Sequence, residues 1–257
     1  MTVAQKKTHL LLDPQDPPPV EVVNAASDHP LLLVCEHAGK AIPQALKDLG
    51  IAQKDRESHV CWDIGAEAVT RMISEALGAP AVLQPYSRLV IDCNRPPDAA
   101  DAIPDVNHGV QALGNRALTE TARAARVAEI FEPFQATVAH CIKQHPRRIV
   151  LSIHSFTPML NGQPRPWHIG FLFRKDKETS ACLGRFIQDA QPQLTIGMNE
   201  PYQIDDASDW FVPHHGEASG LPHSLIEIRN DLIGDVQGQQ TWADILTVAI
   251  NRYLKEV

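Results

Sequence analysis

Three short apolar runs in this 257-residue chain are each followed at once by titratable residues. The runs are residues 31–35, 149–153 and 224–226, and the residues that follow them are Glu36-His37, His154 and Glu227. Runs of Leu, Val and Ile are typical of buried β-strands. In an open α/β sheet, ligands bind at the carboxyl ends of the strands. We therefore expect these histidines and carboxylates to meet at one sheet edge, where they can move protons or hold a metal ion.

A fourth apolar run, residues 89–91, lies between charged and polar side chains. Arg88 precedes it, and Asp92, Asn94 and Arg95 follow it before two prolines. The run predicts a short buried strand, which the prolines end. Arg binds a carboxylate through two parallel hydrogen bonds, so these residues indicate a site that holds a substrate carboxylate and stabilises a developing oxyanion. An Arg–Asp ion pair that only caps the strand is the alternative interpretation.

Asp63 precedes a helical pattern that starts at Ile64. Asp is a favoured helix N-cap, worth about 1 kcal/mol, and this structural role is one interpretation. The carboxylate can also point into the site, because capping and metal binding can use different oxygens. Two histidines and one carboxylate from separate elements are a ligand set of catalytic zinc. Such a zinc ion lowers the pKa of a water to about 7, and a second carboxylate off the metal can serve as general base.

Composition and missing motifs exclude several classes of protein. The net charge of −8 argues against binding to a nucleic-acid backbone, and no apolar stretch is long enough to span a membrane. The leucine run at residues 10–12 is too short for a signal peptide, and five cysteines without Cys-x-x-Cys spacing indicate reduced thiols in the cytoplasm. His-Glu-x-x-His, Gly-x-Ser-x-Gly and the phosphate-loop motifs are absent from the sequence.

Strand and helix patterns alternate along the chain from residue 31. The predicted strands are residues 31–35, 81–83, 89–91, 149–153, 167–173 and 224–228. The predicted helices are residues 64–77, 118–144 with a kink at Pro133, 181–190 and 241–254. This alternation predicts one α/β domain, residues 31–257, with a central mixed, mainly parallel sheet between helices. Residues 1–30 contain five prolines and are expected to form a surface segment.

Five motifs together resemble the N-formylglutamate amidohydrolase family, itself similar to zinc carboxypeptidases and aspartoacylases. They are Glu36-His37-Ala38-Gly39, Trp62-Asp63-Ile64-Gly65, Ser87-Arg88 with Asn94-Arg95-Pro96, His154-Ser155-Phe156 and Glu227-Ile228-Arg229-Asn230-Asp231. The resemblance runs from about residue 30 to 235. It implies a zinc-exopeptidase-like (phosphorylase/hydrolase-like) α/β fold, one Zn²⁺ ion and hydrolysis of a linear amide in a small, carboxylate-bearing N-acyl amino acid.

The resemblance also implies roles for particular residues. The zinc ligands would be His37, Asp63 and His154, and Glu227 would be the general base. Arg88 would stabilise the oxyanion, while Asn94 and Arg95 would bind the substrate carboxylate. Glu36 occupies a position where other members have Pro, and it would either support a ligand or replace one.

One stretch departs from members that act in histidine breakdown, which resemble Thr-Arg-His-Tyr-Gly. Here it reads Val212-Pro213-His214-His215-Gly216, in which His214 keeps its place and is expected to touch substrate. The Arg is missing, so a hydrolase of other acyl-amino acids or short peptides stays open as an alternative. A non-catalytic metal- or amino-acid-binding relative is a third interpretation, although a pure binder needs no base such as Glu227. The oligomeric state stays open.

Further expectations concern loops. His108 is expected on a flap over the site, and residues 205–209 in a solvated acidic turn. His215 is expected either in solvent or in the lining of the site.

Overall fold

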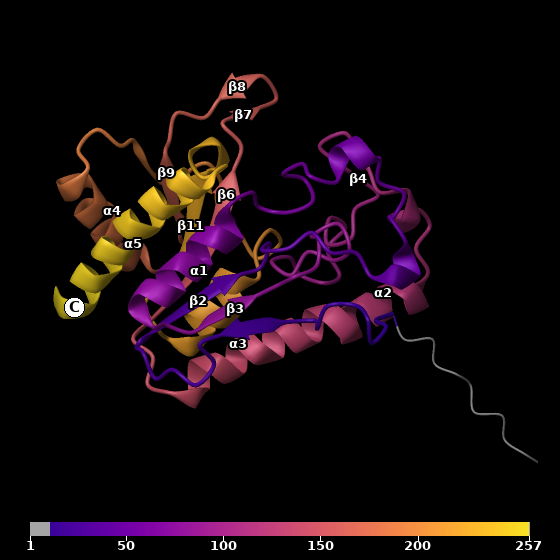
Figure 1. The fold of residues 1–257 in the computed structure, drawn as a ribbon, viewed down its shortest axis with the longest axis horizontal. Coiled ribbons are helices and arrows are strands. Elements are labelled where there is room, and N and C mark those ends of the chain that lie inside the picture. Colours follow the sequence, from indigo (N-terminus) through magenta and orange to yellow (C-terminus); the bar gives the residue numbers. More distant parts are fainter. Residues whose placement is uncertain (1–10, 257) are drawn as a thin grey trace, which may run out of the picture.

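A central β-sheet organises residues 11–256, the part of the chain that the computed structural model describes (Figure 1). Within this part the sheet has seven strands in the order β1-β3-β2-β6-β11-β9-β10. Strands β3, β2, β6 and β11 are mutually parallel, whereas β1 and β9 run antiparallel to their neighbours β3 and β11. The predicted mixed, mainly parallel sheet in a single α/β domain is confirmed.

The elements have the following bounds. The strands of the sheet are β1 Glu21–Val23, β2 Leu31–Cys35, β3 Ala81–Leu83, β6 Ile149–Phe156, β9 Ile169–Leu172, β10 Ile196–Met198 and β11 His223–Arg229. The helices are α1 Ala66–Leu77, α2 Glu120–Arg126, α3 Glu132–Gln144, α4 Lys177–Ala190 and α5 Val236–Glu256. Two small hairpins pair β4 Val106–Asn107 with β5 Val110–Gln111, and β7 Met159–Leu160 with β8 Gln163–Pro164.

The long helix predicted for residues 118–144 is interrupted as expected. A π-helical turn, Val127–Phe131, separates α2 from α3 directly before Pro133. Proline has no N–H to continue the helical hydrogen bonds, which explains an irregular turn at this place.

Alternate residues of each inner strand point to opposite faces of the sheet. In β6, Ile149, Leu151 and Ile153 belong to a core that also contains residues of α1, α4 and α5. Val150 belongs to the core on the other face, together with Phe134 of α3. Helices α1 and α5 lie together on one side of the sheet and α3 lies on the other (Figure 1).

The α3 face changes from apolar to polar toward the carboxyl ends of the parallel strands. After Val150, the next two residues of β6 on this face are Ser152 and His154. Glu227 on β11 pairs in register with His154, so both side chains lie on the same face. The period-2 pattern of the strands therefore places the candidate base beside a candidate metal ligand.

Residues 89–91 do not form the predicted strand. They are a buried turn whose carbonyl oxygens are bound by side chains: Asn115 donates to Leu89 (2.8 Å), and Arg126 donates to Val90 (2.8 Å). Arg126 also donates to the Asn115 side chain (2.7 Å). A buried turn is stable only when its backbone groups have such partners, and these partners are distant in sequence.

The N-terminal segment expected on the surface contains a strand. Glu21–Val23 forms β1, an edge strand that pairs with β3. Residues 1–10 of this segment lie outside the described residues. Glu21 forms an ion pair with Arg71 of α1 (2.7 Å), which ties the edge strand to the helix next to it.

We expect the free energy of unfolding of the Asn115→Ala variant to be about 2–4 kcal/mol lower than that of the wild type, because the variant leaves one buried carbonyl, one partly buried carbonyl and part of Arg126 without partners. Urea unfolding monitored by circular dichroism measures this difference. Asn251→Ala, at an exposed position on α5, is the control and should change stability by less than about 0.5 kcal/mol. Equal stability of both variants would show that the turn does not depend on Asn115.

Candidate active site

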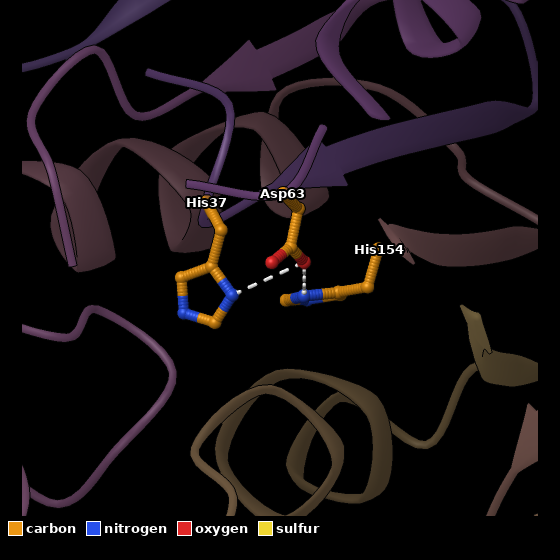
Figure 2. A group of neighbouring side chains, drawn as sticks. All are labelled: His37, Asp63 and His154. Atoms are coloured by element: carbon orange, nitrogen blue, oxygen red, sulfur yellow. Dashed lines mark hydrogen bonds and ion pairs between the residues drawn. The ribbon is translucent and has the colours of Figure 1, made fainter. Parts of the chain in front are cut away.

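His37, Asp63 and His154 converge at the carboxyl edge of the sheet (Figure 2). All three side chains are buried, and one potential ligand atom from each lies within 4.8 Å of the other two. The Oδ2 atom of Asp63 lies 2.9 Å from Nδ1 of His154 and 3.4 Å from Nδ1 of His37. The structure thus brings together the three residues that the sequence predicted as metal ligands.

Backbone contacts hold Asp63 in this position. Its N–H donates to the carbonyl of His37 (3.0 Å), and its Oδ2 accepts from the N–H of Ser155 (3.2 Å). The chain then turns at Gly65, which has a φ of 82° and is the N-cap of α1. A side chain at Gly65 would lie 2.2 Å from the carbonyl oxygen of Ile233, so only glycine fits. The interpretation of Asp63 as helix cap is therefore wrong, and its carboxylate faces the site.

Two further carboxylates orient the histidine rings from behind. Asp92 Oδ1 lies 2.7 Å from Nε2 of His37, and Glu36 Oε2 lies 3.0 Å from Nε2 of His154. Ser152 also donates to Glu36 (2.6 Å). Because ionised carboxylates only accept, each ring donates its Nε2 proton outward and turns Nδ1 toward Asp63. This carboxylate–histidine arrangement is the one that orients metal-binding histidines. Glu36 thus contacts His154 from behind, as the supporting role expected from the sequence requires.

The acids of this cluster are held in their ionised form. Burial opposes ionisation, but Arg88 and His37 keep the pKa of Asp63 well below its usual range, and His37 and Arg88 do the same for the pKa of Asp92. Burial also favours a neutral His154, yet its contacts with Asp63 and Glu36 raise its pKa well above the ordinary value. The His154 ring is thus surrounded by negative charge and favours a positive charge at Nδ1.

Arg88 supplies positive charge at this place. Its Nη1 lies 3.3 Å from Asp63 Oδ1, its Nε lies 3.7 Å from Asp92 Oδ2, and its Nη2 contacts the ring nitrogens of His37. Arg88 therefore reaches the candidate metal ligands although it precedes the turn at residues 89–91. The simple strand-capping ion pair is not what the structure contains, because that strand is absent and the guanidinium lies in the site.

Glu227 is a buried carboxylate beside the cluster. It lies in register with His154 and lines the cavity, and its Oε2 has no hydrogen-bond partner among residues 11–256. Burial raises the pKa of Glu227 to about 8, assisted by the charge of Asp63 and opposed by His154 and Arg88. A carboxyl group with this pKa can both take up and release a proton near neutral pH.

A cavity of about 620 Å³ opens over these residues. Its walls include the β4–β5 and β7–β8 hairpins and residues 202–209, which lie far apart in sequence. His108 stands at the turn of the β4–β5 hairpin with a φ of 44° and lines the cavity, as expected for a segment that covers the site. The volume lies in the range of ligand-binding cavities.

The other predicted substrate-binding residues differ in position. Arg95 lines the cavity at its rim and pairs with Asp101 (3.1 Å). Asn94 also lines the cavity, but its amide donates to Asp209 (2.8 Å) and accepts from the backbone of Phe211 (2.9 Å), so it holds the segment around residue 210 in place. His214 is not brought to the cavity: it is exposed and stacked on Trp210, with ring centroids 3.7 Å apart.

Two expectations about loops were wrong. Asp209 does not belong to a solvated turn: it is buried, lines the cavity and accepts from Asn94, and burial raises its pKa to about 6. His215 neither faces solvent nor lines the cavity: it is buried against α3, with Nε2 2.7 Å from Oε1 of Gln135. Gln135 in turn donates to the carbonyl of Cys93 (2.6 Å), so these contacts support the loop that carries Asn94.

Sequence reasoning missed the roles of Asp92, His59 and Tyr202. His59 and Tyr202 line the cavity, and His59 Nε2 lies 3.9 Å from Asp63 Oδ1. Asp92 was assigned only to a strand end, although it lies four residues after Arg88 and two before Asn94 in a motif that was recognised. Neither His59 nor Tyr202 belongs to a motif or to the end of an apolar run, so the sequence held no comparable signal for them.

The donor set fits a divalent cation. Three potential ligand atoms face one another here: Nδ1 of both histidines and Oδ2 of Asp63. Asp63 Oδ1 has no hydrogen-bond partner among residues 11–256, although it is buried. The three ionised carboxylates at Glu36, Asp63 and Asp92 outnumber the one guanidinium that contacts the cluster in this part of the chain. Two histidines and a carboxylate match the ligands of a catalytic zinc ion.

Comparison with known proteins identifies the family. A model of the N-formylglutamate amidohydrolase family matches residues 29–234. The chain therefore belongs to this family, as the sequence motifs predicted, and amide hydrolysis is the class of reaction that the family assigns to it. No curated protein has a sequence that matches this chain.

Two solved structures share the fold over nearly the whole chain. A gene product of Agrobacterium tumefaciens is 36% identical, with a TM-score of 0.90, over 95% of this chain and 98% of that one. The N-formylglutamate amidohydrolase of Ralstonia eutropha JMP134 is 17% identical, with a TM-score of 0.70, over 93% and 98% of the two chains. The second likeness, at this low identity, shows the fold alone. Among the described residues, no helix has the length and apolar character needed to cross a membrane.

We predict that purified protein binds about one zinc ion per chain, and that His37→Ala and His154→Ala lose it, because each removes one of three ligands. Plasma emission spectrometry after dialysis against zinc measures the content. His140→Ala removes an exposed histidine of α3 and should keep the metal. Full zinc content in both site variants would show that the metal, if any, is held elsewhere.

We also predict a pH dependence of stability from His215. Burial lowers its pKa from the ordinary 6.5 to about 4, so the unfolded chain binds the proton more tightly than the folded one. Burial of neutral His215 therefore makes the free energy of unfolding depend on pH. The free energy of unfolding is unaffected above about pH 6.5 and falls by about 3 kcal/mol in total as the pH falls from about 6.5 to 4. His215→Gln should flatten the stability profile in this window, measured by urea unfolding. His140→Gln should not, and equal slopes in both variants would contradict the assignment.

Proposed function

We propose that the protein hydrolyses the amide bond of a small N-acyl amino acid that bears a carboxylate, as N-formylglutamate does, with a zinc ion at His37, Asp63 and His154. The observation that carries this proposal is the position of Glu227, a buried carboxylate with an unpartnered oxygen beside the candidate ligands and in the cavity wall. Family membership supports an amide as the bond that is broken.

The residues of the cluster then have separate tasks. A zinc ion held there would polarise the substrate carbonyl, lower the pKa of a water to about 7 and lower the pKa of Glu227. Glu227 takes a proton from the attacking water and delivers it to the leaving amine. Arg88 donates hydrogen bonds to the negative charge that develops on the carbonyl oxygen. Asp92 and Glu36 keep the two histidine rings oriented.

Arg95 is proposed to bind a substrate carboxylate at the rim. Its partner Asp101 is mostly exposed, and exposed ion pairs of this kind contribute little, about 0–1 kcal/mol. A substrate carboxylate can therefore replace Asp101 with little loss. Asn94 keeps one amide N–H that Asp209 does not use, and this N–H is available for the same ligand.

A second candidate substrate class is favoured by the walls of the cavity. Val106 and Met159, one on each hairpin, are each 49% exposed and line the cavity. Leu160 and Ile204 add further apolar surface to the wall. An acyl-amino acid or short peptide with an apolar group would bury this surface, whereas N-formylglutamate would not. A screen of N-formyl, N-acetyl and N-succinyl amino acids for amine release separates the two classes.

The Glu227→Gln variant should keep its metal and lose turnover by about 10²–10⁴-fold, because the amide preserves size but cannot accept the proton. Release of amine from the best substrate of the screen measures turnover, and metal content is measured in the same samples. Glu75→Gln, exposed on α1, is the matched control and should retain wild-type turnover.

Near-normal turnover of Glu227→Gln would show that Glu227 is not the base. A wild-type protein that binds metal and ligand but releases no amine from any compound would favour a non-catalytic relative instead.

A further inference from the structure

Arg165 is a buried arginine next to the cavity that has no carboxylate partner. Its side chain is 6% exposed, and no carboxylate among residues 11–256 lies within ion-pair distance of it. Its Nη1 donates to the hydroxyl of Tyr202 (3.0 Å) and weakly to the carbonyl of Thr157 (3.4 Å), both residues of the cavity wall. Its Nη2 has no partner in this part of the chain.

The two arginines in the cavity wall differ from Arg165 in this respect. Arg88 lies between Asp63 and Asp92, and Arg95 pairs with Asp101. Buried charges are normally paired, because burial without a partner is unfavourable. Arg165 therefore leaves uncompensated positive charge behind the cavity wall, where it attracts an anion.

Tyr202 contacts Arg165 and also lines the cavity. The guanidinium of Arg165 lies 4.9 Å from the centre of the Tyr202 ring and binds its hydroxyl oxygen. Arg can only donate, so the hydroxyl accepts this bond and its own proton is left for another partner. Among residues 11–256 this hydroxyl makes no hydrogen bond in which it is the donor. Tyr202 is 40% exposed and lines the same cavity as Arg88 and Glu227.

Both the ring and the hydroxyl of Tyr202 contact Arg165, the hydroxyl as an acceptor. Because Tyr202 also lines the cavity, a ligand bound there can accept the hydrogen bond that this hydroxyl has left to donate. Burial raises the pKa of Tyr202, an effect that Glu227 reinforces and Arg165 opposes, so the hydroxyl keeps its proton at neutral pH.

We propose that Tyr202 donates a hydrogen bond to a carboxylate of the bound substrate, and that Arg165 is the positioning residue that orients and polarises its hydroxyl. A hydrogen bond to a charged acceptor is stronger than one to a neutral carbonyl, which favours a carboxylate as the partner. This inference rests on the proposed function for the identity of the ligand as a carboxylate-bearing acyl-amino acid, and it adds to Arg95 a second residue that contacts a substrate carboxylate.

Binding to an inactive protein tests the inference without turnover. Calorimetric titration of Glu227→Gln protein with N-formyl-L-glutamate should give a dissociation constant roughly 10- to 100-fold lower than the same titration of Glu227→Gln/Tyr202→Phe. Tyr253→Phe, which removes a hydroxyl bound to Thr179 outside this cavity, is the matched control and should leave binding unchanged.

Two amides show whether the partner is a carboxylate. N-formyl-L-glutamine lacks the side-chain carboxylate, and N-formyl-L-isoglutamine lacks the α-carboxylate. The penalty of Tyr202→Phe should disappear with one of these two ligands and persist with the other. An equal penalty with all three ligands, no penalty with any of them, or no binding of any of them by protein that retains Tyr202 would overturn the inference.

A double-mutant cycle tests the role of Arg165. Arg165→Met should weaken binding of N-formyl-L-glutamate in protein with Tyr202, and should have little effect in the Tyr202→Phe background. A merely structural Arg165 would weaken binding equally in both backgrounds.

Turnover separates this inference from the proposed function. If protein that retains Glu227 binds N-formyl-L-glutamate through Tyr202 but releases no amine, the proposed function fails and the inference stands. If it releases amine and Tyr202→Phe lowers kcat without raising KM, the proposed function stands, and the inference fails because Tyr202 then acts on the reacting atoms.

Discussion

The site depends on the burial of several carboxylates around two imidazole rings. Asp63 lies between His37 and His154, while Asp92 and Glu36 hold the far nitrogens of the same rings. Buried acids of this number are stable only with compensating positive charge. Arg88 supplies part of that charge. The two Nδ1 atoms that face Asp63 supply the rest when they carry protons or bind a cation, so the cluster could hold a metal ion.

The sheet explains why these residues meet. On the α3 face, Ser152 and His154 follow the apolar Val150 along β6, and Glu227 follows the apolar Leu225 along β11. Parallel pairing in register places Glu227 beside His154, and Glu36 follows β2 to reach Ser152. Much of the cavity wall comes instead from hairpins and loops, so one scaffold can hold the same polar cluster and accept different ligands.

Much of this arrangement could be predicted from sequence, because it depends on local pattern. The period of the strands and the residues that end them indicated the sheet and its polar edge, and the family motifs indicated the candidate ligands and base. The turn at residues 89–91 could not be predicted, since Leu-Val-Ile favours a buried strand and the turn depends on Asn115 and Arg126, which bind its carbonyls and are distant in sequence. The role of Tyr202 could not be predicted either, because its environment depends on Arg165, which is distant in sequence. His214 was placed by motif position, which does not tell where a side chain points.

The most direct test of a metal centre is anomalous X-ray scattering from crystals grown with zinc, with data collected on both sides of the zinc absorption edge. The account predicts one strong peak in contact with His37, Asp63 and His154, with Asp92 and Glu36 still bound to the far ring nitrogens. Crystals that show no peak there, with His154 still hydrogen-bonded to Asp63 in the presence of zinc, would contradict it.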